Sequence, residues 1–359
     1  GGIADAIVAH KADTKDGQPD PTGVVASGWG AGQTGTALAK MSPEDKSNVA
    51  FVILDNNTNR AGGGFWTTYA PFAPLLATSA EPTPSYTGVP TLDVAYEYNI
   101  NSDAPVDPLN PFAVGNSLAA YVYGYGAQST AVIPPDVMKE AQSTSGPHYS
   151  YVIDTKGNII SKSAEPVDGT TTYVTIQQDN LPLTRPLRLI PGGDIVADAI
   201  DPTMTELVNA GYNDGKGVPA GTGPMGRPYP ADPAIPADPT ETRRMKPGSS
   251  LSALDAGALQ ESVQEGASDG AQTAIEDVSE PTNFVTKPLK EAGKLPIISS
   301  LAPSTQTNST VSTNNIKASS PNFFAPVLPG TGNKNSSTGS AATGGNALKS
   351  FTDQVSDTV

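Results

Sequence analysis

The chain has 359 residues and a net charge of −15, with 16% charged residues, 36 Gly and 34 Pro. This acidic balance argues against nucleic acid and an anionic membrane surface as ligands, because binding to phosphates needs Lys and Arg. The absence of cysteine excludes thiolate catalysis, disulfides and Cys-ligated metals, and two histidines, His10 and His148, cannot supply three His ligands. No apolar run approaches the roughly 18 residues of a membrane-spanning helix.

The first elements form a strand, helix and strand. Residues 3–10 are typical of the end of a helix, and a strand is predicted over 23–27. The glycine run GWGAGQTG follows, and then a helical segment over 36–41. The continuous apolar run at 48–55 is typical of a strand that is buried on both faces of a parallel sheet. This βαβ pattern predicts an α/β fold.

The middle of the chain continues the alternation of strands and helices. A hairpin is expected because two strand-like runs flank the turn sequence Thr155-Lys156-Gly157-Asn158. The remaining predicted elements are an alternating segment at 92–98, a helix at 111–125, the hairpin strands at 148–154 and 159–163, a β-branched strand at 171–177 and a helix at 195–210.

The composition changes near residue 281. Before it, residues 251–278 predict a helix with Leu251, Leu254, Leu259, Val263 and Ile275 on one face. After it, Ser, Thr, Asn and Gly dominate, and such a segment cannot offset its ordering entropy by burial. We therefore expect a domain over 1–281 and a tail over 282–359. Its apolar islands at 295–301 and 323–328 suggest a docking extension, and a spacer is the alternative.

The glycine run allows three interpretations. Gly30-Ala31-Gly32-Gln33-Thr34-Gly35 matches GxGxxG after a strand, and Asp55 ends the next strand, where a dinucleotide-binding fold has its ribose-binding acid. Alternatively, Gly28-Trp29-Gly30-Ala31-Gly32 has the flanking glycines of a nucleophile elbow, with glycine in place of serine. The third interpretation is a tight turn that binds nothing.

Four segments resemble segments of the mycobacterial PE-PPE domain family and follow one another in the same order. The members of that family are cutinase-like serine α/β-hydrolases of the cell envelope. They are VVASGWGAGQTG, FVILDNNTNRAGGGF, DVAYEYNINSDAPVDPLNPFAVGNSLAAYVYGYG and NLPLTRPLRLIPGGDIVADAIDPTMTELVNAGY. The resemblance covers roughly residues 1–281 and favours the elbow interpretation. It implies an α/β-hydrolase sheet with helices on both faces, and it implies that the family's first strand would precede Gly1.

The resemblance also implies that the catalytic triad is lost. The serine position of the family falls on Gly30, the first acid position on Asn99 and the histidine position on Tyr125, while Asp103 matches a second aspartate. Glycine has no nucleophilic oxygen, asparagine carries no charge, and a tyrosine with an ordinary pKa near 10 is a poor base at neutral pH.

The remaining candidates for chemistry are few. Ser27 and Thr34 are the hydroxyls nearest to the glycine turn, and we expect neither at its apex. His148 is expected on the surface or in a loop, and His10 at the end of its helix. The aromatic residues Phe65, Trp66 and Tyr69 are candidates for lining an apolar groove, or else for core packing.

The expected function is that of a catalytically inactive, hydrolase-like binding or scaffolding protein, secreted or in the cell envelope. Its partner would be an envelope protein complex or a lipid or acyl ligand, with no nucleic acid, cofactor or metal. The alternative is an active esterase, lipase or acyltransferase that acts on envelope lipids through an unrecognised nucleophile.

Overall fold

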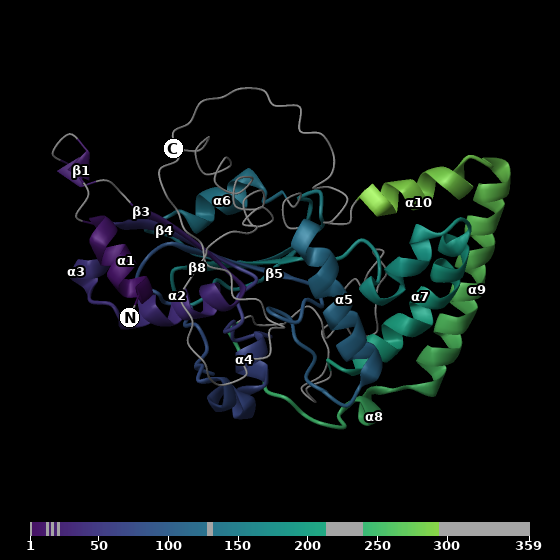
Figure 1. Ribbon diagram of the computed structural model, residues 1–359, viewed down its shortest axis with the longest axis horizontal. Coiled ribbons are helices and arrows are strands. Elements are labelled where there is room, and N and C mark those ends of the chain that lie inside the picture. Colours follow the sequence, from purple (N-terminus) through teal and green to yellow (C-terminus); the bar gives the residue numbers. More distant parts are fainter. Residues whose placement is uncertain are drawn as a thin grey trace, which may run out of the picture.

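The computed structural model describes residues 2–11, 14–15, 18–19, 22–127, 132–212 and 240–293. This part of the chain is built around a six-stranded sheet in the order β3-β4-β5-β8-β6-β7, with helices on both faces (Figure 1). Its strands are β3 (Thr22–Ser27), β4 (Val49–Asp55), β5 (Thr91–Tyr96), β6 (Ser150–Ile153), β7 (Ile159–Lys162) and β8 (Thr171–Ile176). All neighbours are parallel except the β6–β7 hairpin. The predicted α/β class is confirmed, and the predicted strands and hairpin are present.

Two apolar cores cover the two faces of the sheet. Successive residues of β4 point to opposite faces, so Val52 packs with Leu38 in one core, while Ile53 packs with Val137 in the other. This double burial is the reason for the continuous apolar run of β4. Helices α1 (Gly2–Lys11) and α2 (Gly28–Lys40) cover the first core, and the short helix α3 (Pro43–Lys46) lies beside α1. Helix α6 (Pro135–Ala141) covers the second core.

A group of helices lies beyond the carboxyl edge of the sheet (Figure 1). A third apolar cluster joins it to the sheet, since Tyr98, just after β5, packs there with Ala113 and Val208. The group contains α5 (Pro111–Ala127), η2 (Pro182–Leu189), α7 (Gly193–Ala210), α8 (Ser250–Ala253), α9 (Ala256–Ser279) and α10 (Asn283–Gly293). The short elements β1 (Thr14–Lys15), β2 (Gln18–Pro19), α4 (Phe65–Thr68) and η1 (Ala70–Leu76) complete the described chain.

The contact between α7 and α9 differs from the sequence-based expectation. A Cβ atom at Gly266 would lie 2.0 Å from the carbonyl oxygen of Ala199, and one at Gly270 would lie 2.8 Å from the Ala199 Cβ. The two backbones therefore approach closely through small residues. The predicted apolar face does not make this contact, and the side chains of Leu251, Val263 and Ile275 are 82%, 56% and 61% exposed. That interpretation was wrong because it assumed that large apolar side chains would mark the buried face.

Helix α10 extends the folded part beyond the expected boundary at residue 281. The Lys287 ammonium lies 3.0 Å from Asp194 of α7 and 2.6 Å from Asp277 of α9. Glu291 lies 3.7 Å from Arg185 of η2. The predicted tail over 282–359 thus begins with a packed helix, while its islands at 295–301 and 323–328 lie outside the described residues.

Candidate functional site

Three neighbouring strands end in left-handed turns at the carboxyl edge of the sheet. Gly28 has φ 57° after β3, Asn56 has φ 54° after β4, and Tyr98 has φ 64° two residues after β5. For residues other than glycine this conformation costs free energy, and such positions gather at functional sites. This edge is therefore the candidate site.

The turn between β3 and α2 has the geometry of a nucleophile elbow, but its apex is Gly28. The resemblance assigns the serine position to Gly30, but the positive φ lies at Gly28, because α2 begins directly after β3 and Gly30 lies within its first turn. A Cβ atom at Gly30 would meet nothing within 4 Å. By this geometry the nucleophile would be carried by residue 28, which is a glycine and has no side chain.

Beside this apex, an exposed serine is hydrogen-bonded to a buried carboxyl group. The Ser27 hydroxyl donates to Asp55 Oδ2 at 2.8 Å. Burial raises the pKa of Asp55 to about 6, the hydroxyls of Ser27 and Tyr96 oppose the rise, and the nearby Asp93 adds to it. The pair places a hydroxyl next to a proton acceptor with no imidazole between them. The other candidate hydroxyl, that of Thr34, is buried in α2.

The loop after β5 brings the predicted position Asn99 close to the turn. Asn99 is fully buried, and its side-chain oxygen accepts a hydrogen bond from the backbone N–H of Asn101 at 3.0 Å. A Cβ atom at Gly28 would lie 3.5 Å from the side-chain nitrogen of Asn101. Asn101 was missed in the sequence, where its only signal is its place in the loop after the third strand of the sheet.

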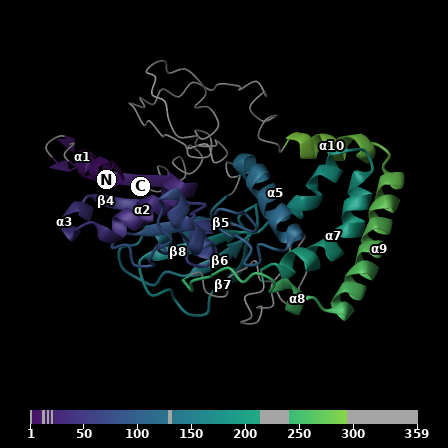
Figure 2. The same ribbon diagram turned by 60° about the horizontal axis from the view of Figure 1, so that its bottom comes forward.

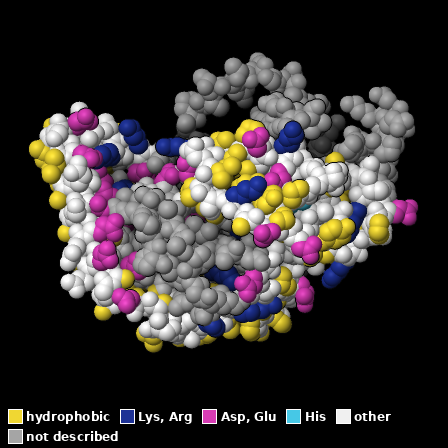
Figure 3. Space-filling model, turned by 180° about the vertical axis from the view of Figure 1, so that it is seen from behind, with side chains coloured by type: hydrophobic (Ala, Val, Ile, Leu, Met, Phe, Trp, Pro, Cys, Tyr) yellow, Lys and Arg dark blue, Asp and Glu magenta, His cyan; other side chains and the backbone are white. Residues whose placement is uncertain are grey.

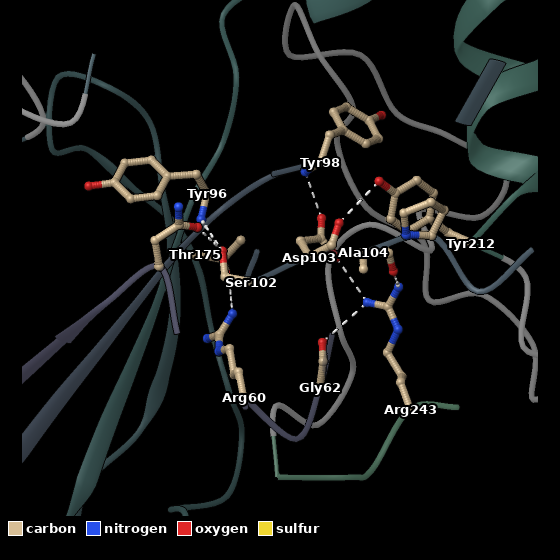
Figure 4. A network of polar contacts seen from close by, with 12 residues as sticks. Arg60, Gly62, Tyr96, Tyr98, Ser102, Asp103, Ala104, Thr175, Tyr212 and Arg243 are labelled. Carbon is tan, nitrogen blue, oxygen red and sulfur yellow. Dashed lines mark hydrogen bonds and ion pairs between the residues drawn. The ribbon is translucent and has the colours of Figure 1, made fainter. Parts of the chain in front are cut away.

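The second predicted acid, Asp103, forms a buried ion pair. Its Oδ1 lies 2.9 Å from the Arg243 guanidinium, and its Oδ2 accepts a hydrogen bond from the Tyr98 backbone at 2.7 Å (Figure 4). Arg243 also donates to the carbonyl oxygens of Gly62 and Ala104. Burial raises the pKa of Asp103, and Arg243 opposes that shift. Asp103 thus holds together loops that are far apart in the sequence.

His148, the histidine whose side chain is described, is not at this edge. It is 2% exposed, and its Nδ1 lies 2.9 Å from the Thr172 hydroxyl near the amino end of β8. Burial lowers its pKa, while Glu140 acts in the opposite direction. His148 was expected on the surface or in a loop; it lies just before β6, in an isolated backbone bridge to Val167, and its side chain is buried. His10 lies in α1 and Tyr125 in α5, and both side chains are outside the described residues.

An aromatic cluster adjoins the turn. Trp29 and Trp66 have ring centroids 5.4 Å apart, and Phe65 packs against Trp66 at 4.8 Å and against Tyr69 at 5.0 Å. Trp66 and Tyr69 are buried, and the Tyr69 hydroxyl donates to the Pro105 carbonyl. Phe65 and Trp29 are half-buried. Of the predicted groove residues, Phe65 thus has the most access to a ligand, and Trp29 joins it.

A comparison with family models matches residues 26–213 to the PE-PPE domain. The chain belongs to the PE-PPE domain family. The match begins inside β3, spans the elbow-like turn and the three strand ends, and finishes just after α7. Among the described residues of this PE-PPE protein, no helix is long and apolar enough to cross a membrane, and no three acidic or histidine side chains are grouped as a metal site.

Two curated relatives of this PE-PPE protein are described as uncharacterized proteins. PPE family protein PPE42 of Mycobacterium tuberculosis (strain CDC 1551 / Oshkosh) is 32% identical over 164 residues, which is 45% of this chain and 24% of that protein. PPE family protein PPE28 of Mycobacterium tuberculosis (strain ATCC 25618 / H37Rv) is 28% identical over 186 residues, 49% of this chain and 24% of that protein. The chain thus spans about a quarter of the length of these relatives. No solved structure matches it.

Proposed function

We propose that this PE-PPE domain is a binding module without hydrolase activity. The observation that carries the proposal is Gly28, because the apex of the elbow has no side chain to attack an ester. A serine hydrolase also needs a base that takes the proton and an acid that orients the base. The nearby Asn99 is uncharged, and Asp103 is paired with Arg243.

The proposed ligand is an acyl chain with a polar carbonyl head. The rings of Trp29 and Phe65 offer apolar contact beside the turn, while the side-chain amide of Asn101 and the hydroxyl of Ser27 offer polar contact. Ligand sites commonly combine an apolar lining with a few polar anchors. The mycobacterial relatives are compatible with a secreted or envelope protein. We expect its partner to be a lipid or an envelope protein.

Labelling with a fluorophosphonate probe tests the absence of catalysis. The purified protein and its Ser27→Ala variant should both lack a covalent adduct by mass spectrometry. Gly28→Ser should restore a side chain at the apex without restoring ester hydrolysis, because no imidazole is described at this edge. A stoichiometric adduct on the unmodified protein would contradict the proposal.

Binding is tested separately by titrating laurate while tryptophan fluorescence is recorded. A ligand beside Trp29 should change the emission, and Asn101→Ala should weaken binding by roughly tenfold, as expected for one lost polar anchor. Val278→Ser, on the exposed outer face of α9, is the matched control and should bind like the unmodified protein. The acyl ligand is refuted if laurate leaves the emission unchanged.

One observation favours a second function, that of an esterase or acyltransferase. The Ser27 hydroxyl already donates to Asp55, whose raised pKa of about 6 suits a general base near neutral pH. In that case the probe should label Ser27, and both Ser27→Ala and Asp55→Asn should abolish the labelling.

A further inference from the structure

The short helix η1 presents an apolar tip to solvent. The side chains of Phe72, Leu75 and Leu76 are 49%, 77% and 58% exposed, and we refer to them as the η1 tip. No charged residue occurs anywhere over 61–80. Large apolar side chains that are exposed together, without charges among them, mark an interaction surface.

The η1 tip is held in place next to the candidate site. Ala77 ends η1 in the left-handed conformation with φ 51°, and the backbone N–H of Thr78 donates to the Ala73 carbonyl at 3.1 Å. The indole N–H of Trp29 donates to the Thr78 hydroxyl at 3.0 Å. The tip is therefore tied to the first turn of α2, beside the elbow-like turn at Gly28.

A cationic segment runs next to the tip. We name residues 240–249 the strap. The backbone N–H groups of Arg243 and Met245 in the strap donate hydrogen bonds to the carbonyl oxygens of Ala61 and Thr68, which precede η1. Arg244 and Lys246 of the strap are exposed, and the Arg244 guanidinium also donates to the Thr67 carbonyl. The exposed charged residues of the strap are the basic Arg244 and Lys246 and the acidic Glu241, while Arg243 is buried in its ion pair with Asp103. The strap thus exposes more basic than acidic side chains in a chain whose net charge is −15.

The arrangement of these parts is visible in the figures. The strap leads into α8, and Figure 1 has α4 and α8 along the same lower edge of the molecule. Figure 2 turns this lower edge toward the viewer, with α8 below α7. From behind, Figure 3 shows hydrophobic side chains along the lower edge with Lys and Arg side chains between them.

We infer that the η1 tip and the strap together dock this domain on a phospholipid surface. Apolar side chains enter the acyl region while neighbouring cations meet the phosphate headgroups, as at other interfacial segments. The local cations allow this contact although the whole chain is acidic, since charges more than about 10 Å away are largely screened at physiological salt. The inference goes beyond the proposed function because it needs no ligand at Gly28.

A single labelled cysteine tests the inference directly, because the chain has no cysteine of its own. Leu75→Cys carries a polarity-sensitive fluorophore, and Val278→Cys, at a site on α9 with 74% exposure, is the control. Vesicles of equal parts phosphatidylcholine and phosphatidylglycerol should shift the emission to the blue at position 75 and leave position 278 unchanged. Equal shifts at both positions, or no shift at position 75, would overturn the inference.

Co-sedimentation with the same vesicles measures the strength of docking. Leu75→Ser with Leu76→Ser should weaken binding at least about tenfold, because the free energy falls when a leucine side chain leaves water for the acyl region. Arg244→Gln with Lys246→Gln should weaken it less and should reduce its dependence on salt. Val263→Ser with Val278→Ser should bind like the unmodified protein. Equal loss in that control, or no binding of the unmodified protein, overturns the inference.

The laurate titration distinguishes the two proposals. The η1 variant Leu75→Ser with Leu76→Ser should keep laurate binding at the Gly28 turn while losing vesicle binding. A protein that binds laurate but ignores vesicles refutes only the docking surface. One that binds vesicles but not laurate refutes only the acyl ligand.

Discussion

The carboxyl edge of the sheet and the α7–α9 helix pair are stabilised in different ways. At the edge, buried charges face each other, as in Asp103 with Arg243 and in Asp93 with Arg60, whose Oδ1 and Nε atoms are 3.0 Å apart. In the helix pair, the absence of side chains at Gly266 and Gly270 lets two backbones meet. Charge pairs thus join the loops of the edge, whereas close backbone approach joins the two helices, with Lys287 of α10 between Asp194 and Asp277.

The largest expected effect is at the edge. Arg243→Met leaves the buried Asp103 without its partner, so the free energy of unfolding should fall by about 3 to 5 kcal/mol. Urea unfolding followed by circular dichroism measures this loss. Adding Asp103→Asn to Arg243→Met should recover part of it, because no charge then stays buried alone. If Arg243→Met were as stable as the unmodified protein, charge pairing would not stabilise this edge.

The helix pair should respond to added volume. Gly266→Ala places a methyl group 2.0 Å from the Ala199 carbonyl oxygen, so the helices must separate, at a cost of roughly 3 kcal/mol by thermal unfolding. Gly30→Ala is the matched control in a helix, because its methyl group meets nothing within 4 Å. That change should raise stability by up to about 1 kcal/mol. Similar effects of both changes would show that close approach is unimportant.

A smaller effect, dependent on pH, is expected at the edge. The folded-state pKa of Asp55, about 6, lies above its ordinary value of 3.8, so its contribution to stability falls as pH rises from about 4 to 6. The full cost above pH 6 is no more than about 3 kcal/mol. In Asp55→Asn this decline should become shallower, because burial also raises the pKa of Asp93 and Asp103. Urea titrations at several pH values compare the two proteins. An unchanged decline would mean that other groups cause it.

The sheet could be predicted from the sequence because the burial of each strand is visible in its own residues. The run at 48–55 is apolar throughout, and the turn Thr155-Lys156-Gly157-Asn158 separates two strand-like runs, so both elements were found. The α7–α9 contact was missed because small residues leave no hydrophobic period. Gly266 and Gly270 can be recognised as contact residues only once Ala199 of α7 is known to lie against them.

The site was predicted only in part. The glycine turn and the Asn99 loop were located because each follows a recognisable strand, whereas the apex was misplaced by two residues. The backbone dihedral angle of Gly28 depends on where β3 ends, and several glycines in a row allow more than one ending. The partner of Asp103 was missed because Arg243 lies 140 positions away along the chain.

The separation between Arg243 and its partners has a consequence for the order of folding. Its guanidinium closes contacts with Gly62 over 181 positions and with Ala104 over 139 positions, and contacts that span such long stretches form slowly. The parallel strands pair over shorter distances and can form before the strap arrives. We therefore expect Arg243 to join the loops of the carboxyl edge after the sheet has formed.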